Sequence, residues 1–136
     1  MILIDTGPLI ALVNARDQDH DACVPAAENL TDVELVTTWP CYTEAMYLLH
    51  REGGLPYQEA LWQFRASGIL SIHATSIDAE SRIQIMMTEY ADSPMDLADA
   101  SLVAKAETMG VHTLFTIDRH FHAYRLADGG CLQIVP

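Results

Sequence analysis

The sequence predicts an α/β fold built around a mostly parallel sheet. Short apolar segments of strand length alternate with longer segments whose apolar residues recur at helical spacing. That alternation is typical of proteins in which helices connect parallel strands. The predicted strands are also continuous apolar runs, as expected when helices cover both faces of a sheet. These strands are predicted over residues 1–4, 33–38, 69–74, 112–117 and 131–135.

Two helices are predicted between the first and second strands. Residues 8–15 carry apolar side chains at helical spacing, and Pro8 suits a helix start because no hydrogen bond is lost there. Residues 17–30 form the second predicted helix, in which Pro25 marks either the start or a break.

Two more helices are predicted between the second and third strands. Residues 42–52 have helical periodicity and stop at Gly53, and residues 56–67 are ended by Gly68. Glycine commonly follows the end of a helix because it tolerates the left-handed backbone conformation found there.

The last two long helices are predicted between the third and fourth strands. Residues 77–91 return to helical spacing. Residues 96–110 form the clearest helix of the sequence, with Gly110 in the position of a C-terminal cap. A short polar segment, residues 118–121, follows the fourth strand.

The composition fits one domain but does not favour nucleic-acid binding. The chain has 136 residues, half of them hydrophobic and 19% charged, so we expect residues 1–136 to form a single folded domain. Nineteen acids against seven lysines and arginines give a formal net charge of −12, which argues against binding a phosphate backbone. That objection weakens if several acids surround a bound cation.

The cysteines and the apolar segments indicate a cytoplasmic protein. Cys23, Cys41 and Cys131 form no CxxC pair, which argues against a zinc site or a disulfide framework. The N-terminus does not have the pattern of a secretion signal, and no apolar run reaches the roughly 18 residues of a membrane span. We therefore expect a cytoplasmic protein that does not contact membranes.

Two predicted strands lead directly into an aspartate. Residues 1–4 run into Asp5, and residues 112–117 run into Asp118. Ligands of open α/β sheets bind beyond the carboxyl ends of the strands, so neighbouring parallel strands would bring both carboxylates into one crevice. Either aspartate alone could equally be a turn former or a helix cap.

Two predicted helices carry further acids among apolar residues. Glu44 lies in the helix over residues 42–52, while Asp96 and Asp99 are three apart and share one helix face. Asp96 could as well be an N-terminal cap. Asp99 lies in more apolar sequence, where an unpaired charge is costly, and the chain has few cations to pair with it.

Acids that converge without a lysine or arginine repel one another, and a hard divalent cation relieves that repulsion. Mg²⁺ and Mn²⁺ prefer oxygen ligands and also bind phosphate groups. Such an ion can activate water and stabilise the charge that develops when a phosphodiester is cleaved. The residues alone therefore predict metal-dependent phosphodiester hydrolysis.

Four motifs together resemble the PIN-domain family, and in particular the VapC-type toxin ribonucleases of toxin–antitoxin systems. They occur in the family's order along nearly the whole chain as ILIDTGPLIAL, TEAMYLL, DLADASLVAKAETMG and LFTIDRHF. The resemblance implies a three-layer α/β/α sandwich with a parallel sheet of about five strands. It also implies an endoribonuclease dependent on Mg²⁺ or Mn²⁺, a small antitoxin protein as partner, and a homodimer.

The resemblance also implies which residues form the active site. The four family acids correspond to Asp5, Glu44, Asp99 and Asp118. Asp96 would be a supporting fifth acid. Thr6 and Thr116 correspond to small polar residues near the first and last acids, where a hydroxyl could orient a carboxylate or a metal-bound water, or equally cap the backbone.

Few basic side chains are available to hold RNA. The candidates, each more often a solvated surface residue, are Arg16, Arg51, Lys105, Arg119 and Arg125. Arg119 is favoured because it adjoins Asp118. The remaining negative surface predicts weak general affinity for RNA and a narrow choice of substrate.

Other interpretations stay open. The chain could be a PIN-fold nuclease or phosphatase outside toxin–antitoxin systems, or a non-catalytic PIN-fold module that only binds a partner. A receiver-like signalling domain is disfavoured because it has an adjacent acidic pair early, whereas LIDTGP holds one acid. We expect Trp39 and Trp62 to pack, in the core or at a partner interface, and His120 and His122 to have surface or packing roles.

Overall fold

The computed structural model describes all 136 residues and contains one five-stranded sheet in which every neighbouring pair is parallel. The strand order is β3-β2-β1-β4-β5. The prediction of a mostly parallel sheet of about five strands is confirmed, and each strand is shorter than predicted. The strands are β1 (Ile2–Ile4), β2 (Leu35–Thr38), β3 (Leu70–His73), β4 (Thr113–Phe115) and β5 (Gln133–Val135).

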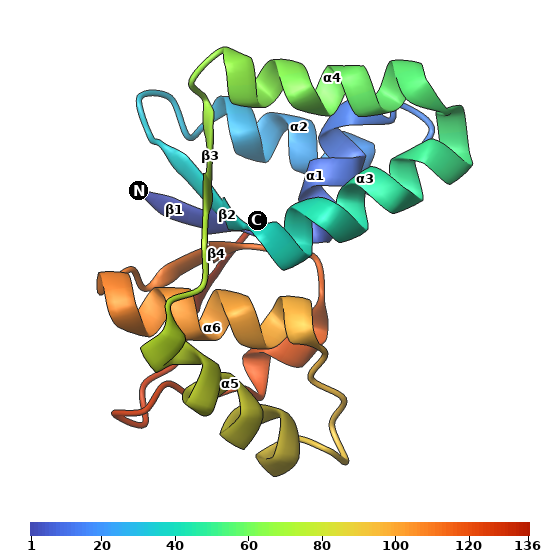
Figure 1. The fold of residues 1–136 in the computed structure, drawn as a ribbon. Coiled ribbons are helices and arrows are strands. Elements are labelled where there is room, and N and C mark those ends of the chain that lie inside the picture. Colours follow the sequence, from blue (N-terminus) through green and yellow to red (C-terminus); the bar gives the residue numbers. More distant parts are fainter.

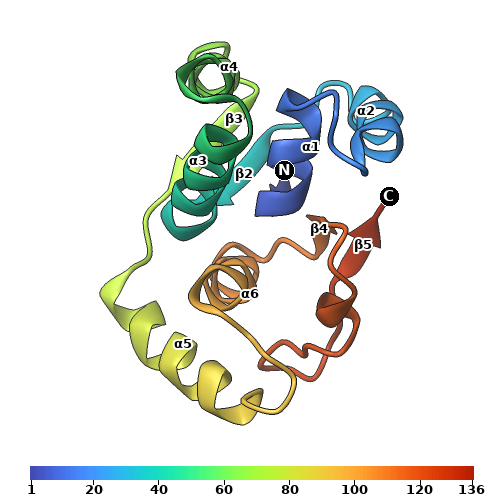
Figure 2. The same cartoon turned by 90° about the vertical axis from the view of Figure 1, so that its right-hand side faces the viewer.

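Helices cover both faces of this sheet, which confirms the predicted three-layer α/β/α sandwich. Figure 2 shows α1 to α4 on one side of the strands and α5 and α6 on the other. Leu3 packs in the cluster of α5 and α6, and the next residue, Ile4, packs in the cluster of α1 to α4, because successive strand side chains face opposite ways. The helices are α1 (Thr6–Val13), α2 (His20–Glu28), α3 (Trp39–Gly53), α4 (Leu55–Ala66), α5 (Ile77–Glu89), α6 (Leu97–Met109) and the short 3₁₀ helix η1 (Arg119–His122).

Three helix starts differ from the prediction by more than one residue. Helix α1 begins at Thr6, two residues early, because Asp5 already caps it. Helix α3 begins at Trp39, directly after β2, and accommodates Pro40 in its first turn, where a missing N–H costs nothing. Pro25 marks neither a start nor a break: α2 begins at His20, and Pro25 lies inside it, three residues before the helix ends.

The chain order of the strands creates a crevice between β1 and β4. From β1 the chain moves outward to β2 and then β3, and it returns to the other side of β1 as β4 (Figure 1). The connections on the two sides of β1 therefore diverge at this point, which is where open α/β sheets bind ligands. Asp5 follows β1 and Thr116 follows β4, so both lie at this crevice.

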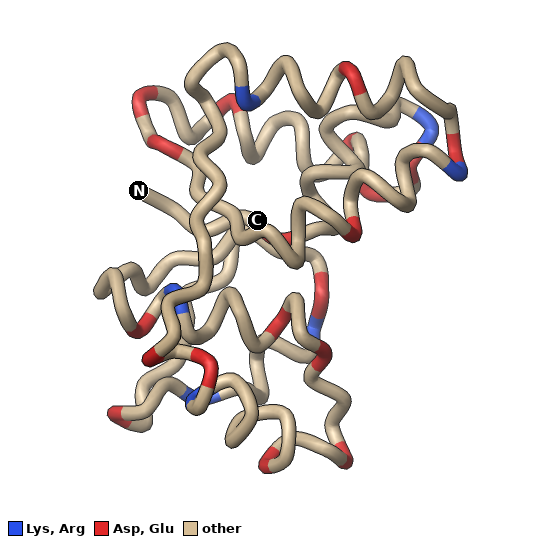
Figure 3. The backbone as a smooth tube through the Cα atoms, viewed as in Figure 1, with Lys and Arg blue, Asp and Glu red and all other residues tan.

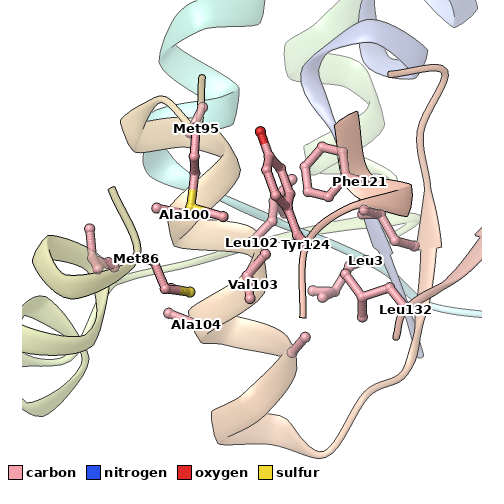
Figure 4. Packing of buried hydrophobic residues seen from close by; sticks show 14 of the residues in the cluster. Leu3, Met86, Met95, Ala100, Leu102, Val103, Ala104, Phe121, Tyr124 and Leu132 are labelled. Atoms are coloured by element: carbon pink, nitrogen blue, oxygen red, sulfur yellow. The ribbon is translucent and has the colours of Figure 1, made fainter. Parts of the chain in front are cut away.

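Helix α6 lies between the sheet and α5, and most of it is buried. Figure 4 shows Leu102 and Val103 of α6 within the cluster that also contains Leu3 and Tyr124. A tightly packed helix of this kind holds the residues of its first turn in a fixed position. Although α6 is so buried, neither it nor any other helix is long and apolar enough to cross a membrane.

We expect Leu102→Ala to lower the free energy of unfolding by about 2–5 kcal/mol, because Leu102 is fully buried and its loss leaves a cavity. Leu97→Ala in the same helix is the matched control, since Leu97 is 53% exposed. Chemical denaturation monitored by circular dichroism measures both. Equal effects of the two substitutions would contradict this account of the core.

Candidate active site

Asp5 is a buried carboxylate at the carboxyl end of the central strand. It is 6% exposed and forms the N-cap of α1. Its Oδ1 accepts a hydrogen bond from the backbone N–H of Thr6 at 2.7 Å, and its Oδ2 accepts one from the hydroxyl of Thr116 at 2.7 Å. The Sγ of Cys41 lies 4.0 Å from Oδ1. Both oxygens therefore have neutral donors, and neither has a cation.

The surroundings of Asp5 disfavour its charge. Burial raises its pKa to about 6, and the negative charges of Asp118 and Glu44 act in the same direction. The hydrogen bonds from Thr116 and Thr6 act in the opposite direction and are outweighed. Three acids from three parts of the chain are therefore close enough to influence one another.

Glu44 is linked to Asp5 through Thr6. The Thr6 hydroxyl donates to Oε2 of Glu44 at 2.8 Å and also lies 3.3 Å from the carbonyl oxygen of Cys41. Glu44 is half-buried on α3, one helical turn after Cys41, and so faces the same crevice. Thr6 thereby joins the first turn of α1 to α3 with its hydroxyl and donates its N–H to Asp5, the N-cap of α1.

Asp96 and Asp99 begin α6 with a reciprocal capping box. Oδ1 of Asp96 accepts from the N–H of Asp99 at 2.8 Å, and Oδ2 of Asp99 accepts from the N–H of Asp96 at 3.2 Å. The alternative prediction that Asp96 is a helix cap is confirmed. Asp99 is 8% exposed, and burial raises its pKa to about 7, with the charges of Asp96, Asp5 and Asp118 adding to the effect.

Asp118 ends the segment after β4, and its side chain is 36% exposed. Its backbone N–H donates to the Thr116 hydroxyl at 3.0 Å, so this hydroxyl connects Asp118 to Asp5. Its Oδ1 accepts from the N–H of His120 at 2.9 Å and lies 2.8 Å from Nδ1 of the same residue. Arg119 is exposed at the start of η1 and forms no ion pair.

The structure thus brings Asp5, Glu44, Asp99 and Asp118 to one edge of the sheet, and none of them forms an ion pair with a lysine or arginine. Figure 3 shows acidic positions in red where the start of α6 faces α3, with a basic position in blue beside them. The ion pairs of the molecule lie elsewhere, around Arg82, apart from the His120–Asp118 contact. The repulsion among these acids is left uncompensated by the protein itself.

The oxygen atoms of this site suit a hard divalent cation as ligands, but they do not form a complete coordination sphere. All candidate donors are carboxylate or hydroxyl oxygens, the ligands that Mg²⁺ and Mn²⁺ prefer. No three His, Cys, Asp or Glu side chains are arranged as a ready set of metal ligands. Hydrogen bonds to the Thr6 N–H and the Thr116 hydroxyl occupy both oxygens of Asp5. An ion here would keep several waters, as Mg²⁺ usually does in proteins.

Three residues lie at this site although the sequence did not predict them as part of it. Cys41 contacts Asp5, and its position one turn before Glu44 could have indicated this. His120 was expected to have a surface or packing role; it is exposed, but it also binds Asp118, only two residues away. Tyr124 is buried, and the charges of Asp99 and Asp118 add to the effect of burial in raising its pKa. No sequence pattern indicated its position.

We expect the Asp5→Asn variant to be more stable than the wild type at neutral pH in EDTA. The pKa of Asp5 rises from 3.8 to about 6 on folding, so below pH 3.8 its carboxyl is protonated in both states and carries no cost. Above pH 6 the charge is present in both states, and the folded state carries the full cost, roughly 2–3 kcal/mol.

Urea denaturation of both proteins between pH 3.5 and 7.5 measures this effect. The stability of the variant minus that of the wild type should increase as the pH rises from about 3.8 to about 6 and then level off. A difference that is constant, or that shrinks with rising pH, would show that Asp5 is not held in a charge-disfavouring site.

Comparison with known proteins agrees with this architecture. The PIN domain family model matches residues 2–126. The chain is 30% identical over 139 residues to Ribonuclease VapC26 of Mycobacterium tuberculosis, covering 99% of this chain and 100% of that protein. The crystal structure of VapC20 of Mycobacterium tuberculosis, described as a Sarcin-Ricin loop cleaving toxin, has the same fold, with a TM-score of 0.85 and 21% identity over 100% of both chains. The chain therefore belongs to the PIN domain family.

Proposed function

We propose that this chain is a metal-dependent endoribonuclease that hydrolyses RNA phosphodiester bonds, and that it is the toxin of a VapBC-type toxin–antitoxin pair. The observation that carries the proposal is Asp5, a buried carboxylate that faces other acids at the sheet's ligand-binding edge and has no cationic partner. Membership of the PIN domain family and the likeness to a VapC ribonuclease support the same activity. A single catalytic domain over residues 1–136 is part of the proposal.

The proposed cofactor is Mg²⁺ or Mn²⁺. Asp5, Asp99 and Asp118 would hold it, with Glu44 bound directly or through water. When bound, such an ion supplies water activation and stabilises negative charge on the phosphoryl oxygens. Because the carboxylates are not arranged as a complete ligand set, we expect part of the coordination to be water.

The chain's other polar groups have positioning roles in this proposal. The Thr116 hydroxyl fixes Asp5 relative to Asp118, and the Thr6 hydroxyl fixes Glu44. Asp96 supports Asp99 by capping the same helix end. Exposed Arg119, free of any ion pair, is available to a phosphate of the substrate. Hydrogen bonds of this kind preserve the direction of a carboxylate while an ion or substrate arrives.

The partners follow from the same assignment. RNA is the proposed substrate, and a small antitoxin protein is the proposed inhibitor. The net charge of −12 opposes general binding to RNA, so recognition has to rest on a few specific contacts. The homodimer suggested by the family resemblance stays a prediction.

Asp99→Asn should reduce Mn²⁺-dependent RNA cleavage by about 100-fold or more, since one of the carboxylates that would hold the charge-stabilising ion is lost. Asparagine keeps the shape and can still accept the Asp96 N–H, so circular dichroism should show an intact fold. Asp78→Asn, an exposed acid in the first turn of α5, is the matched control and should retain wild-type activity.

The assay compares single-stranded RNA, single-stranded DNA and a small phosphate ester, each with Mn²⁺ and with EDTA. Cleavage of RNA alone and only with metal is the expected pattern. Activity that persists in EDTA would contradict the metal dependence, and preference for DNA or the small ester would contradict the substrate.

Expression of the chain without its antitoxin should arrest bacterial growth, and Asp5→Asn should relieve that arrest at equal protein level. Growth curves with immunoblotting measure both quantities. Arrest that is equally strong with the Asp5→Asn variant would show that toxicity does not come from this site, and harmless expression of the wild type would count against a toxin.

A further inference from the structure

A cavity of about 700 Å³ adjoins the acidic site on the side of α3. Glu44 and Asp96 line it, so it opens directly beside the carboxylates that would bind the metal. The rest of its wall includes Trp39 and Tyr47 of α3 and Leu97 at the start of α6. None of the functions assigned above uses these three apolar side chains.

These three side chains are large and mainly apolar, yet each is exposed to solvent. Trp39 is 45% exposed, Tyr47 is 64% exposed and Leu97 is 53% exposed. Trp39 is nevertheless held in place, because its ring packs edge-on against the buried ring of Tyr42 with centroids 5.8 Å apart. The indole is therefore a preorganised surface that is free to receive a flat ligand.

The charges around the cavity restrict what that ligand can be. No lysine or arginine is among its lining residues and two carboxylates are, so the lining disfavours a phosphate group. The Arg51 guanidinium is the basic group closest to this lining, and it lies 6.0 Å from the centroid of the Tyr47 ring. A neutral aromatic ring would not be repelled and would gain by stacking, which is worth about 1–3 kcal/mol per nucleobase on an aromatic side chain. Carboxylate oxygens accept hydrogen bonds only, so they favour a ring that presents N–H groups.

We propose that this cavity binds the nucleobase of the nucleotide next to the scissile phosphate, and that it favours a purine with an exocyclic amino group. This proposal rests on the ribonuclease function proposed above. It names the part of the RNA substrate that the cavity would select. Trp39 provides the stacking surface, whereas the ring of Tyr47 already has the Arg51 guanidinium over it, 6.0 Å from its centroid. Glu44 and Asp96 line the cavity and would accept hydrogen bonds from the amino edge of the base. Uracil fits poorly because two carbonyl oxygens flank its single N–H.

This arrangement reconciles RNA cleavage with an acidic protein. The phosphate next to the metal would be held at the acidic crevice, and the neighbouring base would enter the apolar cavity, where no backbone charge has to be neutralised. Binding energy would then come from stacking rather than from ion pairs, so affinity should depend only weakly on salt.

The test uses Trp39→Ala, with Trp62→Ala as the matched control. Trp62 is 46% exposed and also packs on Tyr42, but it lies on α4 outside the cavity. On a single-stranded RNA whose cleavage site has been mapped with the wild type, Trp39→Ala should lower kcat/KM roughly 5- to 100-fold through KM. Trp62→Ala should stay within about twofold, and Trp39→Phe should recover most of the activity.

A second substrate separates base recognition from a loss of structure. Each RNA of this second set carries one abasic residue, on one side or the other of the cleaved bond. At one of these two positions the abasic residue should lower the activity of the wild type to that of Trp39→Ala. The same abasic residue should not lower the activity of Trp39→Ala any further. Equal activity of wild type and Trp39→Ala on every base-containing RNA would overturn the proposal, and so would a loss from Trp39→Ala that abasic substitution does not reproduce.

A binding measurement keeps this inference separate from the proposed function. In the Trp62→Phe variant, Trp39 is the only tryptophan, and its fluorescence in EDTA should be quenched more by the dinucleotides ApA and GpG than by UpU. Quenching without any RNA cleavage would contradict the nuclease but keep the base site. Absence of quenching, or gel filtration in which Trp39→Ala alone converts a dimer to a monomer, would identify the cavity as something other than a base site.

Discussion

The buried carboxylate of Asp5 is the constraint on which the rest of the site depends. It lies where the strand order reverses beside β1, and hydrogen bonds from Thr6 and Thr116 hold it there without a positive charge. The protein thereby keeps an acid in a place that raises its pKa, with Glu44, Asp99 and Asp118 nearby. Such an arrangement costs stability in the free protein, and a divalent cation of the kind we propose would remove that cost on binding.

The same residues also carry the local structure, so the active site cannot be separated from the fold. Asp5 caps α1, Asp96 and Asp99 cap α6, and Asp118 caps η1. Each of these carboxylates stabilises a helix start, where backbone N–H groups and the helix dipole favour negative charge. The sequence left open whether such an aspartate is a helix cap or a catalytic acid. The two roles are compatible in this structure. One carboxylate can have both roles because each of its oxygens has a further lone pair beside the one that accepts a hydrogen bond.

Much of this architecture was predictable from local sequence. All five strands and six long helices were expected, because apolar periodicity and glycine ends are local signals. The predicted second strand already ended at residue 38, but the start of α3 was missed because a tryptophan and a proline form its first turn, where the apolar helical periodicity had not yet begun. The contacts of Cys41 with Asp5 and of Tyr124 near Asp99 were missed because they depend on how α3 and the segment after η1 pack. Such contacts join distant parts of the chain, and of the two only the position of Cys41, one turn before Glu44, is indicated by a local pattern.

The most direct test of the central claim is the position of Mn²⁺ in crystals grown with the ion, located by anomalous diffraction. The account predicts one or more manganese sites in the crevice between β1 and β4, in contact with Asp5, Asp99 or Asp118 directly or through one water. Manganese bound only elsewhere on the molecule, with this crevice empty at a concentration that supports RNA cleavage, would contradict it.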